Sequence, residues 1–218
     1  MANNNIIPNT INFVKNELIG AEGGHDWFHI ERVYKNAKLI AKEELVDILV
    51  VELAALLHDI ADSKFHDGDE SIGPKKAKDF LITQNIDTAI VTHVINIIAN
   101  MSFSKSLDNT VKFNSLELQV VQDADRLDAI GAIGIARAFN YGGFKNRAIY
   151  NPDIKPILNF TKEAYKKSDA PSINHFYEKL LLLKDKMNTN TGKKIANKRH
   201  LFMELYLTQF YNEWNGEK

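Results

Sequence analysis

The chain has 218 residues, of which 44% are hydrophobic, so it can bury a core and fits one globular domain. Its formal net charge is -1, and this lack of a basic excess argues against binding to nucleic acid or to an anionic membrane. There is no cysteine, which excludes disulfides, thiolate metal sites and cysteine nucleophiles.

The N-terminal segment lacks the basic stretch and apolar run of a secretory signal. The longest apolar stretch, residues 45–60, is interrupted by Asp47 and Glu52, so it is not expected to span a membrane. We therefore expect a soluble, cytoplasmic protein with no membrane partner.

The spacing of apolar residues predicts helices along the whole chain and no β-strand, so the expected fold class is all-α. The predicted helices cover residues 10–19, 27–43, 47–60, 74–83, 88–100, 116–141, 173–187 and 194–214. No internal repeat or linker divides the sequence, and we expect residues 1–218 to form a single domain.

Residue types that bind metals gather in three segments: His29, then His58 with Asp59, then Asp123, Asp125 and Asp128. Asp59 ends an apolar helix, where burying a carboxylate without a partner is costly, so a cation is the natural compensating charge. The same argument applies to Asp125, which lies on another apolar helix. Facing helices of a bundle can hold a metal ion with such imidazole and carboxylate groups.

The segments HDWFHIERV, ALLHDIAD and VVQDADRLDAIGAIGIA resemble the HD superfamily of metal-dependent phosphohydrolases, and particularly its small bacterial subgroup acting on nucleotides. The resemblance covers about residues 24–141 and implies a helical bundle of the HD-domain type, which helices within 173–214 would complete. It also implies hydrolysis of a phosphoester or phosphoanhydride bond. The implied metal ligands are His29, His58, Asp59 and one aspartate of the third segment.

Two aspartates compete for the last ligand position. Asp123 and Asp125 are two residues apart and therefore point to different sides of a helix. The family pattern resembles Ala124-Asp125-Arg126, which makes Asp125 the expected ligand, with Asp128 one turn further on in support. Such a site suits one divalent ion, Mn, Fe, Zn, Co or Ni, and would also tolerate Mg.

The expected nucleophile is a water that the cation activates, so a protein base would be secondary. Asp62 matches the place where related phosphohydrolases carry an acidic residue, and we expect it to act as general acid or base, the alternative being a loop cap. Arg32, one turn after His29, and Lys64 are expected to bind phosphate in catalysis. A surface salt bridge and a solvated lysine are the alternatives for these two.

Four further side chains are candidates for substrate contact: His25, His93, Lys105 and Arg126. His25 and His29 imitate the two-histidine helix of zinc peptidases, but Asp replaces the glutamate base. We expect His25 to orient His29 or to touch substrate, not to bind the metal.

The expected function is metal-dependent hydrolysis of a small phosphorylated molecule, and the expected substrate is a nucleoside triphosphate, deoxynucleoside triphosphate or nucleoside monophosphate. Cyclic nucleotides and alarmones are alternative substrates. A nucleotide-binding sensor without turnover is a further alternative, although the intact set of metal ligands argues against it.

Overall fold

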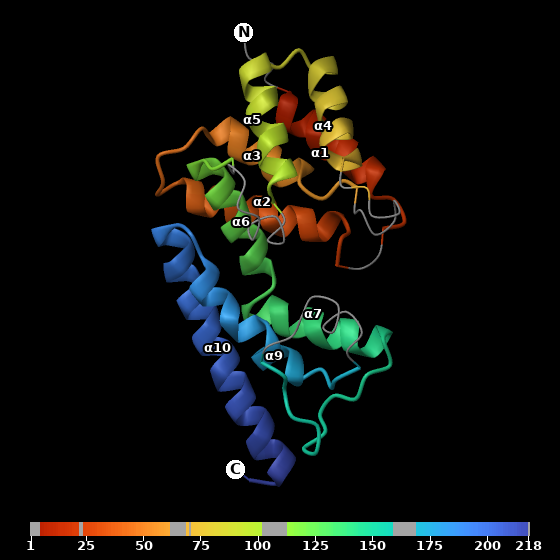
Figure 1. Ribbon diagram of the computed structural model, residues 1–218, viewed down its shortest axis with the longest axis vertical. Coiled ribbons are helices and arrows are strands. Elements are labelled where there is room, and N and C mark those ends of the chain that lie inside the picture. The colour runs from red at the N-terminus through yellow and green to blue at the C-terminus, as the bar shows by residue number, and fades with distance from the viewer. Residues whose placement is uncertain are drawn as a thin grey trace. The chain divides into compact units, whose positions relative to one another are not determined.

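The computed structural model describes residues 5–21, 24–61, 69, 71–101, 113–158 and 169–217. These residues form helices and no β-strand, which confirms the predicted all-α class (Figure 1). The chain divides into two compact units, one ending at Asp125 and the other beginning at Arg126. The expectation of a single domain stays a prediction.

The first unit is built around one fully apolar helix. Its helices are α1 (Ile6–Glu17), α2 (Trp27–Ala41), α3 (Ile48–Leu57), α4 (Ile72–Thr83), α5 (Thr88–Ala99) and most of α6 (Leu116–Asp128). Helix α3 packs against α1, α2 and α5. It buries Val50, Val51 and every residue from Leu53 to Leu57, and each large aliphatic side chain contributes about 1.5 to 3 kcal/mol. The end of α3 is therefore held firmly inside this unit.

The second unit contains α7 (Gly131–Phe144), the short α9 (Asn174–Glu178), the 3-10 helix η3 (Leu180–Lys186) and the long α10 (Asn190–Asn215). Helix α10 packs against α7 and η3 (Figure 1). Ile173, Phe176 and Met203 are fully buried in this core. Thr189 caps the start of α10, and Gly216 ends it in the left-handed conformation that glycine favours.

The single helix predicted over residues 116–141 is wrong, because two helices occupy this range. Helix α6 ends at Asp128 and α7 begins at Gly131. Gly131 has a φ of +75°, a conformation that residues with a side chain rarely adopt and that does not continue a helix. The apolar periodicity continues through this break, so it did not predict that the helix ends there.

Other helix limits also differ from those predicted. Helix α1 begins four residues before Thr10, whose hydroxyl donates to the carbonyl of Ile6 inside the helix instead of capping it. The helix predicted over 173–187 is interrupted at Lys179, where α9 ends and the 3-10 helix follows. Helix α10 begins at Asn190, earlier than the predicted residue 194, because Thr189 provides the cap.

Candidate metal centre

His29 is held at the start of α2 by a helix cap. The Asp26 side chain accepts the backbone N–H of His29 at 3.0 Å. His29 is only 3% exposed. The cap therefore fixes the position of this buried imidazole in the first turn of α2.

His58 lies at the opposite end of its helix, as the first residue after α3. Its Nδ1 is 2.9 Å from the carbonyl oxygen of Ala55. Since a carbonyl only accepts, Nδ1 carries a proton in this contact, and in the neutral ring the lone pair is then on Nε2. That tautomer is the one in which Nε2 can bind a cation.

Asp125 is brought to these histidines by the contact between α6 and α2. The buried Asn36 of α2 donates its side-chain amide to the carbonyl of Ala124 at 3.3 Å. Sequence reasoning missed Asn36. The available signal was a polar residue on the buried face of α2, two turns after His29.

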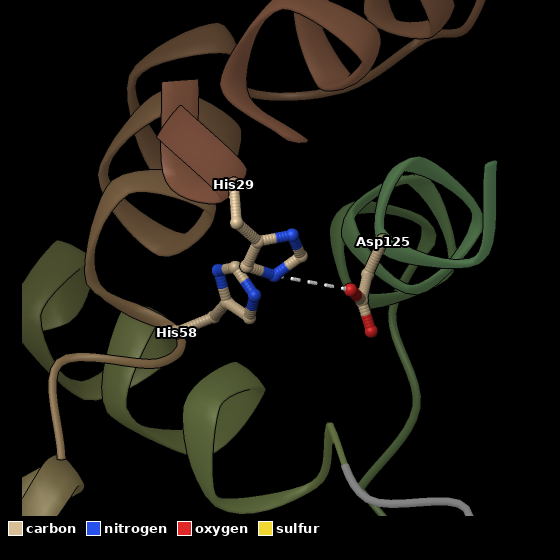
Figure 2. A group of neighbouring side chains, drawn as sticks. All are labelled: His29, His58 and Asp125. Carbon is tan, nitrogen blue, oxygen red and sulfur yellow. Dashed lines mark ion pairs between the residues drawn. The ribbon is translucent and has the colours of Figure 1, made fainter. Parts of the chain in front are cut away.

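The three side chains meet at one place. One ligand atom each from His29, His58 and Asp125 lies within 4.8 Å of the other two. His29 Nε2 is 3.5 Å from Asp125 Oδ1, and the two imidazole centroids are 5.5 Å apart. Figure 2 shows the three side chains approaching one another from three separate segments. Imidazole nitrogens and a carboxylate oxygen are suitable donors for a divalent cation, so this donor set fits a metal site.

Asp59, the fourth expected ligand, lies outside that group of three. Its Oδ2 is paired with His25 Nδ1 at 2.6 Å. Burial raises the pKa of Asp59, but the hydrogen bond from His25 opposes it, and the pKa lies below its usual value. Asp59 is therefore ionised at neutral pH beside the two histidines.

The neighbouring aspartates of α6 have different surroundings. Asp123 is completely buried, whereas the Asp125 side chain is 44% exposed. Asp128, expected to support the ligands, forms a buried ion pair with Arg137 at 2.6 Å in the second unit. Of the three aspartates, the structure brings only Asp125 next to His29.

The same arrangement of helices occurs in solved relatives. The HD domain model matches residues 27–130. A crystal structure of an HD-superfamily hydrolase from Bacillus thuringiensis is 45% identical, with a TM-score of 0.79, and 97% of each chain is covered. The chain belongs to the HD superfamily. Another relative of this HD chain is Bacillus subtilis YpgQ, 37% identical over 94% of this chain and 91% of that protein. A crystal structure of YpgQ in complex with ADP has a TM-score of 0.74 and 36% identity, covering 95% of this chain and 94% of that one.

Membership of the HD superfamily makes the chain a hydrolase and implies a divalent metal ion. The only group of three potential ligands that meets among the described residues is the one formed by His29, His58 and Asp125. No helix in the described ranges is both long and apolar enough to span a membrane.

The other expected site residues of this HD chain stay predictions. His93 contacts Ser115 Oγ at 3.0 Å and Glu117 Oε2 at 3.5 Å. Arg126 donates to the carbonyl of Lys186 at 2.8 Å, within the second unit. Arg32 is partly buried on α2. Three further candidates, Asp62, Lys64 and Lys105, lie outside the described residues.

Proposed function

We propose that this HD-superfamily hydrolase cleaves a phosphoester or phosphoanhydride bond of a nucleotide, with a nucleoside triphosphate or monophosphate as substrate. The observation that carries the proposal is the meeting of His29, His58 and Asp125 within 4.8 Å. The nucleotide part is supported by the ADP in the crystal structure of the relative YpgQ.

We propose His29, His58, Asp59 and Asp125 as the ligands of one divalent ion, with Mn²⁺ as the ion to test first. Two neutral imidazoles and two ionised carboxylates would balance the charge of such a cation. The Ala55 carbonyl orients His58 for this role, and the low pKa of Asp59 keeps its carboxylate ionised. When bound, the ion would make water a better nucleophile at neutral pH and offset negative charge on the phosphate.

The rest of the proposed chemistry concerns the phosphate group. Arg32 follows His29 by three residues on α2, so both side chains leave the helix on neighbouring faces. A guanidinium there could bind two phosphate oxygens at once and orient the phosphorus. We propose Asp62 as the group that exchanges a proton with the attacking water, and Lys64 as a second phosphate contact.

An activity screen tests the function. Purified chain with Mn²⁺ would be incubated with nucleoside mono-, di- and triphosphates and with cyclic nucleotides, and released phosphate and pyrophosphate would be measured separately. We expect release from at least one nucleotide, loss of release with chelator and recovery when Mn²⁺ is restored. The two products also identify which bond is cleaved.

Two results would contradict the proposal. Binding of a nucleotide without any release would identify a sensor. Release that chelator does not affect would exclude a role for the metal. Replacing Asp59 with alanine should abolish both metal binding and release, while Lys35→Ala, which removes an exposed ion pair with Glu31 on α2, serves as the control.

A further inference from the structure

His25 makes a short polar contact between two of the segments that carry the candidate metal ligands. Its Nδ1 lies 2.6 Å from Asp59 Oδ2, across 34 positions of sequence. Both side chains are partly shielded from solvent, with exposures of 35% and 21%. A hydrogen bond to an ionised carboxylate in such surroundings is stronger than a neutral one.

The position of His25 in the chain explains how it reaches Asp59. Asp26 is the cap of α2, so His25 lies just before the helix and is not constrained by it. Its partner Asp59 follows α3 and His58. The contact therefore ties the start of α2, which carries His29, to the end of α3, which carries His58.

His25 itself does not belong to the group of potential ligands, which contains His29, His58 and Asp125. Its ring centroid lies 6.1 Å from that of His29, and the two rings are inclined at 67°. The short polar contact of His25 is with the carboxylate of Asp59, a proposed ligand.

We infer that His25 is a positioning residue that orients the Asp59 carboxylate and thereby raises the affinity of the site for its metal ion. This inference rests on the proposed function. Holding Oδ2 restricts rotation of the carboxylate before the metal arrives, so less conformational entropy is lost on binding. In this arrangement Oδ2 of Asp59 accepts from His25, and the other oxygen, Oδ1, is the one that would bind the cation. Hydrogen-bonded partners of metal ligands commonly change metal affinity by about 10- to 100-fold.

Metal titration without substrate tests this role. Mn²⁺ binding to wild type, His25→Ala and His25→Asn would be measured by calorimetry, and thermal unfolding would verify that each variant is folded. We expect His25→Ala to raise the Kd for Mn²⁺ by about 10- to 100-fold. Asparagine can place an amide N–H near the position of Nδ1, so His25→Asn should recover part of the affinity. Lys35→Ala should leave the Kd unchanged, since its ion pair with Glu31 is exposed.

Two further measurements separate positioning from substrate contact and from general destabilisation. Without metal, the loss of unfolding free energy in the double variant His25→Ala with Asp59→Ala should be smaller than the sum of the losses in the two single variants, because both changes remove the same interaction. At saturating Mn²⁺, the KM of His25→Ala should match that of wild type, whereas loss of a substrate contact would raise it.

The outcomes distinguish this inference from the proposed function. Wild-type binding of Mn²⁺ that His25→Ala leaves unchanged overturns the role of His25 alone, as do additive losses of unfolding free energy in the double variant. A wild-type chain that neither binds Mn²⁺ nor hydrolyses any nucleotide overturns the proposed function and this role together.

Discussion

The neighbours of a histidine or an aspartate decide which of its atoms is available to bind a cation. The Nδ1–H of His58 donates to the Ala55 carbonyl, so in the neutral ring Nε2 is the nitrogen with the lone pair. Asp59 presents a carboxylate of which one oxygen is already held by His25. Residue type and spacing identified both positions from the sequence. The partners that orient them lie three and 34 positions away, and neither was predicted.

The choice between the aspartates of α6 leads to a prediction at this scale. Asp125→Asn should raise the Kd for Mn²⁺ at least about tenfold, because it removes a charge 3.5 Å from His29, and should change stability little. Asp123→Asn should instead lower the free energy of unfolding by about 1 to 3 kcal/mol, since it alters a fully buried polar group.

Calorimetry with Mn²⁺ and denaturant unfolding of both variants measure these effects. Asp185→Asn, an exposed change far along the chain, serves as the control. The reverse pattern, with metal binding lost only in Asp123→Asn, would move the ligand to Asp123.

At the scale of elements, a helix was predicted best where its cap and its apolar pattern agreed. Asp47 caps α3 by accepting from Leu49 and Val50, and the apolar run that follows is the buried centre of the first unit. The break between α6 and α7 was missed because no local signal opposed a helix strongly enough. A glycine inside an apolar periodic run is compatible with either structure, and Gly131 takes the positive φ that interrupts the helix.

Gly134 provides a test of that tight turn. A Cβ at this position would collide with the backbone carbonyl of Ala129, in the connection between α6 and α7. Gly134→Ala should therefore lower the free energy of unfolding by about 1 to 3 kcal/mol. Gly143, also in α7, has nothing within 4 Å of the point where a Cβ would lie, so Gly143→Ala should raise stability by up to about 1 kcal/mol. Denaturant unfolding compares the two, and equal effects would contradict the collision.

At the scale of the whole molecule, the proposed metal ligands all belong to the first unit, and Asp125 is its last residue. The same helix continues into the second unit, where Arg137 donates to the carbonyl of Asp128 and Arg199 to the carbonyl of Leu127. These contacts satisfy carbonyls at the end of α6, one turn after Asp125.

The second unit also contains a histidine that should affect acid stability. Burial, followed by the charges of Lys179 and Arg147, lowers the pKa of His175 from 6.5 to about 4. Between these values the unfolded chain binds a proton that the folded chain does not. Stability should therefore be unaffected by this group above pH 6.5 and should fall as the pH drops towards 4, by up to roughly 3 kcal/mol.

Comparison with His175→Gln isolates this effect, because glutamine does not titrate. Denaturant unfolding of both chains at about pH 7.5, 6 and 5 should show wild type losing more stability than the variant as the pH falls. Equal losses of unfolding free energy in wild type and in His175→Gln would contradict the low pKa of His175.

The sequence by itself determined the all-α class, most of the helices and the order of the candidate ligands, because apolar periodicity, helix caps and residue types are local properties of the chain. The family resemblance of the sequence also grouped Asp125 with His29, and the structure brings these two together. Only the tertiary structure decided that Asn36 of α2 binds α6 and that His25 pairs with Asp59. These contacts join residues 34 or more positions apart, and which of them form depends on how the helices pack, which no local pattern records.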